Sequence, residues 1–230
     1  SYGTGDSSSF DTSGLFSLFL DAYVNGVTNG RSNKGFLYVR STGNSFNSDS
    51  GSCSPTGVSP SNAAYTYSCY DSSYDSDHTE PYLIGVTALN AFDLKSSYST
   101  PGTSAWISGY GGEDGSTDPA MMTTDLMGCD RGYNQSSSVI TGDSNCDYMQ
   151  NFNGTSSAAP SVSGAIALIL EANSNLTWRD IKHILASSAT QIDNSRSKTY
   201  ESVDLYKWTT NAAGFKHHPW YGFGKINVQS

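Results

Sequence analysis

The sequence predicts an α/β fold in which a parallel β-sheet carries helices on both faces. Residues 10–29 repeat apolar side chains at three- and four-residue spacing, which is typical of a helix that packs along one side. Phe36–Val39 is a short, nearly all-apolar run, the pattern of a parallel strand buried on both faces. Val162–Leu170 contains no charged residue and predicts a buried helix.

The first helix and strand place polar residues where such folds carry their sites. Gly30 and the loop to Gly35 end the helix of Phe10–Asn29. The strand Phe36–Val39 runs into Ser41–Asn44, which is polar. In open α/β sheets ligands bind at the carboxyl ends of the strands, so this turn is a candidate site.

Two more strands and one more helix follow. Tyr82–Leu89 and Ser104–Ile107 read as strands, and Thr177 can cap a helix in a capping-box variant with Asp180. His183 lies on that helix, where a lone histidine is usually structural. The helix is expected to face the core with Trp178, Ile181, Ile184 and Leu185.

The composition indicates one large, folded, loop-rich domain. The chain has 230 residues, enough for a sizeable core. Only 36% of residues are hydrophobic and 14% charged, but 15 Tyr, 9 Phe and 4 Trp can fill a core, so the chain is not expected to be disordered. Small polar residues make up the difference, as in extracellular proteins.

The net charge of −9 argues against nucleic acid and against an anionic membrane surface as partners. It favours cationic substrates or bound calcium. No apolar run is long enough to cross a bilayer, and no signal peptide is visible at Ser1.

The four cysteines lie far apart, without a C-x-x-C pair, and allow three disulfide connectivities. We predict two local bridges, Cys53–Cys69 and Cys129–Cys146, because each pair brackets a stretch rich in Ser, Tyr, Asn and Asp. Four free thiols are the alternative. Disulfides imply an oxidising compartment, and hence secretion.

The stretch Asn153–Pro160 is the most informative in the chain. A Gly-Thr-Ser turn runs directly into small residues and then into the uncharged helix. A helix N-terminus offers free backbone N–H groups and the positive end of the helix dipole. Ser156 therefore stands where a nucleophilic hydroxyl and an oxyanion site can lie side by side.

Gly154-Thr155-Ser156-x-Ala158-x-Pro160 resembles the nucleophile motif of the subtilisin superfamily of serine proteases. The following stretch, from Leu170 to His183, is similar to the kexin/furin branch. The resemblance covers nearly the whole chain, and implies that residues 1–230 are the C-terminal portion of one subtilisin-like catalytic domain. Residues 45–80 and 109–151 then read as insertions in that scaffold.

The resemblance also implies roles for residues. Ser156 matches the nucleophile and Asn44, after its strand and a glycine, the oxyanion-binding asparagine. Ser1, Tyr2 and Gly3 match the edge strand that pairs with the substrate backbone. Asp6 falls at the first acidic position of the pocket that holds a basic side chain in convertases. The same resemblance indicates that Met121–Leu126 is a strand and that residues 208–228 form a closing hairpin and the start of a final helix.

The chain departs from the convertase pattern at several positions. Ser7 stands where a second acidic residue is common, and Thr100 where convertases have a calcium-binding Glu. Asp49 lies near another calcium-ligand position. A structural calcium is implied by the resemblance, but its ligands stay unassigned.

A serine nucleophile needs an imidazole base and a carboxylate that orients it. In this superfamily they precede the oxyanion asparagine, but residues 1–44 contain no histidine. His78, His183, His217 and His218 all lie elsewhere. The Asp and His are therefore expected on a separate N-terminal segment, supplied by a nicked protease or by a longer molecule; a non-catalytic remnant is the third explanation.

The function expected from the sequence is that of a secreted serine endopeptidase acting on peptides and proteins, with cleavage after basic residues. An acid-acting relative, the sedolisin type, is an alternative, although sedolisins carry Asp where this chain has Asn44. A non-enzymatic binding module that retains the fold is another.

Overall fold

The computed structural model describes residues 17–46, 68, 70–195, 198–200 and 203–229. Ser1, Tyr2, Gly3 and Asp6 lie outside these ranges, so the expectations for substrate binding stay predictions. Cys53, Cys69 and Asp49 also lie outside them. The elements in chain order are α1 (Ser17–Asn33), β1 (Tyr38–Ser41), the 3₁₀ helices η1 (Ser72–Tyr74) and η2 (Ser76–Thr79), β2 (Leu83–Leu89), β3 (Ala105–Tyr110), β4 (Met121–Thr124), β5 (Tyr148–Phe152), α3 (Thr155–Ala172), α4 (Trp178–Ser188), β6 (Lys198–Tyr200), β7 (Val203–Tyr206), β8 (Thr209–Thr210) and β9 (Lys216–His217).

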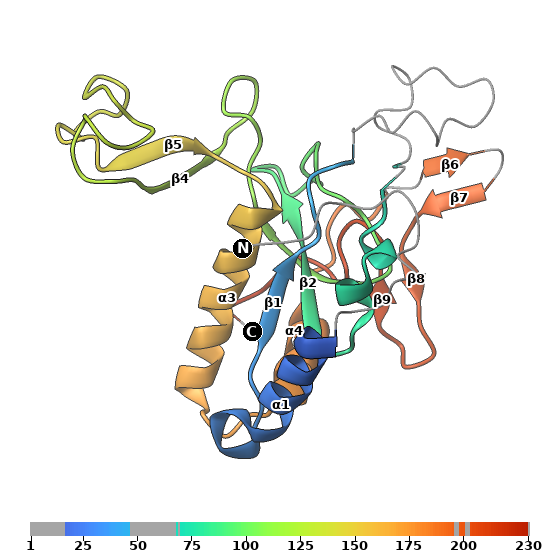
Figure 1. Ribbon diagram of the computed structural model, residues 1–230. Helices are drawn as coiled ribbons and strands as arrows, with labels where there is room; N and C mark the ends of the chain where they lie inside the picture. Colours follow the sequence, from blue (N-terminus) through green and yellow to red (C-terminus); the bar gives the residue numbers. More distant parts are fainter. Residues whose placement is uncertain (1–16, 47–67, 69, 196–197, 201–202, 230) are drawn as a thin grey trace.

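The centre of the fold is a parallel sheet, as the sequence predicted, and its strands lie in the order β1-β2-β3 (Figure 1). α3 and α4 pack on one face of it, and together they form a cluster of buried apolar side chains with the strands. Its buried members are Ile84, Val86, Ala88, Ile107, Ala158, Ala159, Val162, Ile166, Ile181 and Leu185. α1 and the 3₁₀ helices lie against the opposite face: Tyr38 stacks edge-on with Tyr23 of α1, and Arg40 pairs with Asp75 and Asp77.

The first helix ends where the sequence indicated, because Gly30 has an extended ψ of 151° and the next two residues are left-handed. Its apolar face, however, is only partly covered by the described residues. Val27 is buried, whereas Phe19 and Val24 are exposed.

The first strand is two residues further along the chain than predicted, and it is not buried on both faces. Phe36 lies before β1 and is exposed, while Arg40 is the buried residue of the strand. Within the described ranges β1 pairs with β2 alone, so it is an edge strand. By contrast β2, which the sequence predicted only as a strand, is buried at every position.

The helix predicted at Val162–Leu170 is present within α3, but burial on all sides was wrong for the described part of the chain. Val162 and Ile166 face the sheet, whereas Leu168 is 58% exposed. Ala167 is exposed beside it. One side of this uncharged stretch thus faces solvent. No helix among the described residues is long and apolar enough to cross a membrane.

The remaining C-terminal elements agree only in part with the sequence. α4 begins with the predicted capping box of Thr177 and Asp180. The Asp180 carboxylate accepts from the Thr177 backbone N–H, and Thr177 Oγ1 accepts from the Asp180 backbone N–H. β8 and β9 form the predicted closing hairpin. The expected start of a final helix is wrong, because residues 221–229 are turns and isolated bridges. These segments contribute an aromatic cluster of Trp220, Tyr221 and Tyr206 with Phe46.

Two valines test this description of the core, because Val86 is fully buried between sheet and helix while Val228 is 62% exposed. Val86→Ala removes two buried carbon atoms and leaves a cavity, so it is expected to lower the free energy of unfolding by about 2 kcal/mol. Val228→Ala is the matched control and should change it by less than about 0.5 kcal/mol. Urea denaturation measures both; equal effects would contradict the assignment of this core.

Candidate active site

Ser156 lies in the first turn of α3, directly after the tight turn at Gly154. Gly154 has φ 103° and ψ 162°, a positive-φ conformation that residues with a side chain rarely adopt. Ser156 is partly exposed, whereas its neighbours Thr155 and Ser157 are buried. The sequence therefore presents one hydroxyl at the mouth of the helix and hides the flanking two.

The first backbone N–H groups of α3 are satisfied by specific partners, with one exception. Gly154 N–H donates to the Tyr98 hydroxyl at 2.8 Å, and Thr155 N–H donates to Asn44 Oδ1 at 2.9 Å. Ser157 N–H bonds back to the Gly154 carbonyl at 2.9 Å. For Ser156 N–H the described residues provide no acceptor, so this donor points out of the helix end.

Asn44 reaches this helix end from the carboxyl end of β1. Its Oδ1 accepts from the Thr155 backbone and from Thr155 Oγ1, both at 2.9 Å, while Thr155 Oγ1 accepts from Gly43 N–H at 3.2 Å. The turn is held from behind, since Ser45 N–H donates to Thr100 Oγ1 at 2.9 Å. Thr100 thus supports the turn that carries Asn44.

The amide of Asn44 is oriented by these contacts. Because Oδ1 faces the Thr155 donors, Nδ2 faces the other way. A Cβ atom placed on Gly154 would lie 3.4 Å from Asn44 Nδ2, 3.5 Å from Ser156 N and 3.6 Å from Asn44 Oδ1. The Asn44 amide and the Ser156 nitrogen therefore border one small space beside Gly154.

Tyr98, which the sequence did not single out, lies beneath the turn. Its hydroxyl donates to the carbonyls of Gly111 and Gly112 at 2.9 and 2.8 Å while it accepts from Gly154. Burial raises the pKa of the Tyr98 phenol, so the group stays protonated and keeps donating. A tyrosine in a polar stretch gives no sequence signal that it supports a turn 56 residues away.

None of the described histidines hydrogen-bonds to the Ser156 hydroxyl. His78 is buried and donates through Nε2 to the Ser41 carbonyl at 3.1 Å, and His217 donates to the Ala105 carbonyl at 2.9 Å. Burial lowers the pKa of His217. His218 accepts from Trp220 N–H, and His183 packs edge-on against Phe215. The structural role expected for His183 agrees with this placement.

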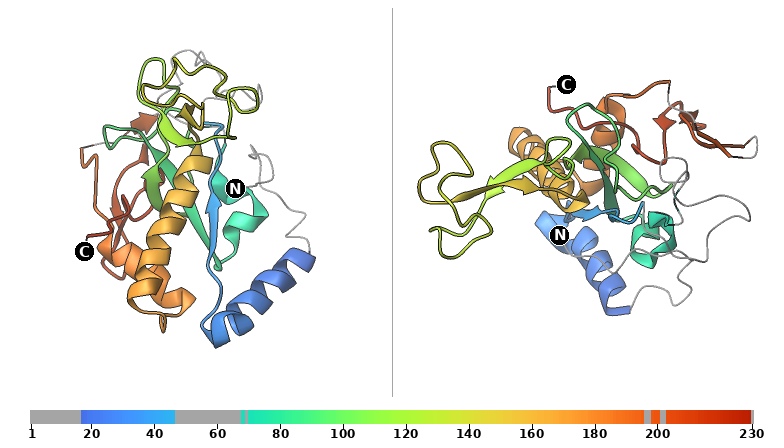
Figure 2. Two further views of the ribbon diagram at one scale, coloured as in Figure 1. Left: turned by 90° about the vertical axis from the view of Figure 1, so that its left-hand side faces the viewer. Right: turned by 90° about the horizontal axis from the view of Figure 1, so that it is seen from above.

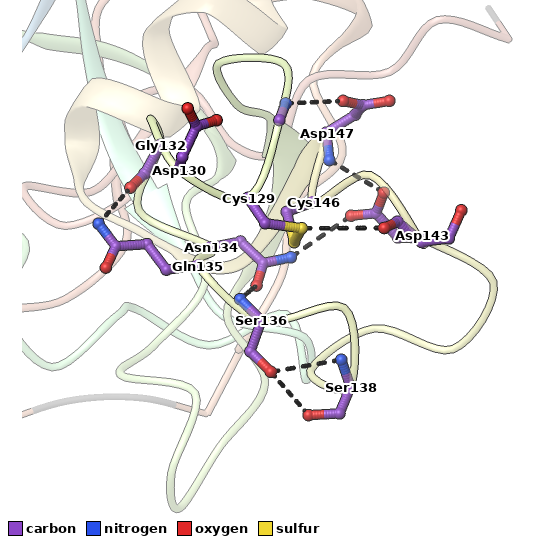
Figure 3. The surroundings of a disulfide bond; sticks show 12 residues. Cys129, Asp130, Gly132, Asn134, Gln135, Ser136, Ser138, Asp143, Cys146 and Asp147 are labelled. Carbon is purple, nitrogen blue, oxygen red and sulfur yellow. Dashed lines mark hydrogen bonds between the residues drawn. A yellow bond between two sulfur atoms is a disulfide. The ribbon is translucent and has the colours of Figure 1, made fainter.

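The predicted strand at Met121–Leu126 is present as β4, but it pairs antiparallel with β5, a strand that the sequence analysis missed. β5 leads into the nucleophile turn. The predicted bridge Cys129–Cys146 is present and closes the connection between the two strands (Figure 3).

Three aspartates organise that connection from within. Asp143 accepts from the backbone of Asp147 and Tyr148 at 2.9 and 3.0 Å, and Asp125 accepts from Asn134 N–H at 2.8 Å. Asp147 in turn accepts from Gly128 N–H at 3.4 Å. The Asn134 bond lowers the pKa of the Asp125 carboxyl.

The described residues do not form a metal site. No group of three or more His, Cys, Asp or Glu side chains gathers among them. Carboxylates that could have served are engaged elsewhere, Asp75 and Asp77 by Arg40 and Asp143 by backbone N–H groups.

The arrangement of a serine at a helix N-terminus beside an asparagine after a parallel strand agrees with the family resemblance. The model of the subtilase family of peptidases matches residues 1–224. The chain belongs to the subtilase family. An extracellular serine protease of Aeromonas sobria is 38% identical over 217 residues, which is 85% of this chain and 34% of the relative. Human proprotein convertase subtilisin/kexin type 5 is 33% identical, over 93% of this chain and 9% of its own length.

Solved structures place the fold in the same family. The A. sobria serine protease in complex with a chaperone superposes with a TM-score of 0.82 at 32% identity, over 99% of this chain and 40% of that one.

Another relative in sequence is a calcium-dependent protease of Trichormus variabilis, which is 35% identical over 68% of this chain and 22% of its own length. The chain thus spans about a third of the length of its A. sobria relative.

The turn under Ser156 can be tested through the tyrosine that supports it. Tyr98→Phe removes the acceptor for Gly154 N–H and is expected to lower the free energy of unfolding by about 1–3 kcal/mol. Tyr110→Phe deletes the same hydroxyl from an exposed contact with Asp93 and should cost less than about 1 kcal/mol. Parallel urea melts compare the two; an equal or larger loss in Tyr110→Phe would contradict the support assigned to Tyr98.

Proposed function

We propose that this chain supplies the nucleophile and the oxyanion-binding groups of a secreted serine endopeptidase. The observation that carries the proposal is the contact between Asn44 and Thr155, which brings the Asn44 amide to the same small space as Ser156 N–H. Two neutral donors that converge beside a partly exposed serine hydroxyl suit an acyl transfer, because they stabilise negative charge on oxygen without bearing charge themselves.

In the proposed reaction Ser156 Oγ attacks the carbon of the scissile carbonyl and gives its proton to a general base. The carbonyl oxygen becomes an oxyanion held by Asn44 Nδ2 and Ser156 N–H. The C–N bond then breaks, and the amine leaves with the proton that the base returns. Water, deprotonated by the same base, attacks the acyl-enzyme and restores the Ser156 hydroxyl.

The base and the carboxylate that orients it come, in this proposal, from an N-terminal segment of the same protease. The exposed apolar flank of α3 supports this, since Leu168 and its neighbours suit a covering segment better than water. So does a cavity of about 530 Å³ between α1, β1 and α3, lined by Leu37, Ile166 and Leu170 among others. The relatives are also much longer than this chain.

The proposed substrates are peptides and proteins, cleaved after basic residues. Ser1, Tyr2 and Gly3 pair with the substrate backbone and Asp6 binds the basic side chain, as the family resemblance implies. The net charge of −9 favours the approach of cationic substrates. The extracellular relative and the disulfide support secretion.

Calcium enters the proposal only as a structural ion. The relative named calcium-dependent protease supports it, and among the described residues no group of three or more His, Cys, Asp or Glu side chains marks its position. No step of the reaction passes through the metal. An acid-acting sedolisin-type enzyme is less well supported, because residue 44 is an amide and not a carboxyl group.

The nucleophile is tested with a serine-reactive fluorophosphonate on the complete protease. We expect one modified residue, Ser156, and loss of both labelling and peptide hydrolysis in Ser156→Ala, because the bond-forming oxygen is gone. Ser163→Ala, a serine on the same helix, is the control and should retain both. Tryptic mass spectrometry identifies the labelled peptide. Modification at another serine, or hydrolysis by Ser156→Ala, would refute the assignment; no hydrolysis by the wild type would favour a binding module.

The oxyanion role is tested by Asn44→Ala. Removing one donor should lower kcat by about 10²–10³, the magnitude observed for a subtilisin, with KM nearly unchanged because the interaction forms only in the transition state. Asn29→Ala, at an exposed position of α1, is the matched control and should leave kcat as in the wild type. Steady-state kinetics on one fluorogenic peptide measure both. A rise in KM at constant kcat would instead show that Asn44 binds the ground state.

A further inference from the structure

One projecting part of the molecule has no role in the proposed chemistry. We define the arm as residues 121–152, that is β4, β5 and the connection between them. In Figure 1 the arm extends away from the sheet beyond the N-terminal end of α3, and the view from above in Figure 2 shows the same projection. All four methionines of the chain lie in it: Met121, Met122, Met127 and Met149.

The arm exposes large apolar side chains to an unusual degree. Leu126 is 64% exposed, Met127 76% and Tyr133 87%. Met122 and Tyr148 are exposed on the strands themselves. Scattered apolar residues on a surface are ordinary, but so many on one 32-residue ribbon, numbered 121–152, indicate an interaction surface.

This exposure does not result from a loosely folded loop. The disulfide of Cys129 and Cys146 closes the connection, and the Asp143 carboxylate binds a backbone N–H group inside it (Figure 3). The Asp125 carboxylate likewise accepts from Asn134 N–H. The polar groups of the arm are therefore used inward to fix its shape. Its apolar side chains are left facing solvent on a rigid frame.

The strands provide an ordered face as well. Thr124 pairs with Tyr148, and Met122 lies two residues before Thr124, so the three side chains share one face of the ribbon. That face is the exposed one, since Met121, Thr123 and Met149 on the other are partly covered. Within the described residues the ribbon has two strands only, so no third strand pairs with the outer edge of β4. The outer edge of β5 is occupied at Tyr148, whose N–H donates to Asp143 and whose carbonyl accepts from Asn134 Nδ2. An extended polypeptide can add to an edge such as that of β4 through backbone hydrogen bonds.

The base of the arm is at the candidate active site. β5 ends at Phe152 and α3 begins at Thr155, so the ribbon passes into the nucleophile turn with two residues between them. Asn153 in that turn donates to the Glu113 carbonyl at 2.8 Å, which fixes where the ribbon leaves the domain. The arm is thus joined directly to the turn that carries Ser156.

We propose that the arm binds an extended, apolar segment of the polypeptide substrate that lies several residues from the scissile bond. The inference rests on the proposed endopeptidase function and adds a substrate-binding surface to it. Methionine side chains are flexible and polarisable, so they adapt to apolar sequences of different shape. A surface built from them suits an enzyme that holds many polypeptides through a common apolar character.

The experiment compares three quenched fluorescent peptides with one shared cleavage sequence. One is short, one is extended by an apolar segment of about eight residues, and one by a Gly-Ser segment of equal length; the extensions are made on either side of the scissile bond in turn. For the wild-type protease we expect kcat/KM to be about tenfold higher with the apolar extension on one side than with Gly-Ser, through a lower KM.

The arm variant combines Met122→Ser, Leu126→Ser and Met127→Ser. It is expected to hydrolyse the short peptide like the wild type and to lose the tenfold preference. The control variant combines Phe92→Ser and Val228→Ser, which are 63% and 62% exposed away from the arm, and should keep the preference. Thermal melts of both variants check that they are folded. If the arm variant were unfolded, the single substitution Met127→Ser would replace it, with a smaller loss of the preference expected.

The outcomes separate this inference from the proposed function. Failure of the wild type to cleave any peptide would refute the function itself. Cleavage of the short peptide with no preference for an apolar extension on either side would overturn only the inference. As a second readout, dilute peroxide should oxidise Met122 and Met127 in the free protease, and an apolar extended inhibitor should protect them. Protection already in the free protease would show that another part of the protein covers the arm, and would also overturn the inference.

Discussion

A single side-chain amide joins the two elements on which the site depends. Asn44 and Thr155 are 111 residues apart in the chain, yet three hydrogen bonds among Gly43, Asn44 and Thr155 fasten the carboxyl end of β1 to the N-terminus of α3. The contact satisfies a helix-end N–H that would otherwise remain unpaired, so it stabilises the fold. It also determines which end of the Asn44 amide faces Ser156. Fold stability and the orientation of the candidate donor therefore share one interaction.

The same helix, α3, has an apolar side that the described part of the fold leaves exposed. α3 buries Val162 and Ile166 against the sheet but exposes Leu168, and within the described ranges β1 pairs with β2 alone. A water-facing helix of a domain normally carries charge on its outer side, and α3 carries none from Val162 to Leu170. The sequence of α3 is thus that of a helix enclosed on two sides, while the described structure encloses one. This discrepancy is the physical basis for placing further polypeptide against that flank.

Sequence reasoning succeeded where a local rule decides the structure. Strand β2 was predicted at Tyr82–Leu89, and the start of α4 was evident from the side-chain chemistry of Thr177 and Asp180. It failed where tertiary contacts decide. β1 has a buried arginine because Asp75 and Asp77 neutralise it, and Lys182 is buried in α4 because the carbonyls of Pro81 and Leu83 accept from its ammonium group. Burial lowers the pKa of Lys182 to about 8. No periodicity reveals such partners.

The candidate site divides along the same line. Ser156 and Asn44 were recognisable from short motifs, whereas Tyr98 and the exit of the ribbon at Asn153 depend on contacts over 40 residues or more. Those contacts hold the two residues that connect the arm to the helix of the nucleophile. The arm ends at Phe152, and two residues connect it to α3. Asn153 is held by the Glu113 carbonyl, and Gly154 is held by the Tyr98 hydroxyl. The position of the nucleophile turn is therefore set by these two hydrogen bonds and not by the side chains that the arm exposes, so the arm can differ in sequence while the turn keeps its contacts.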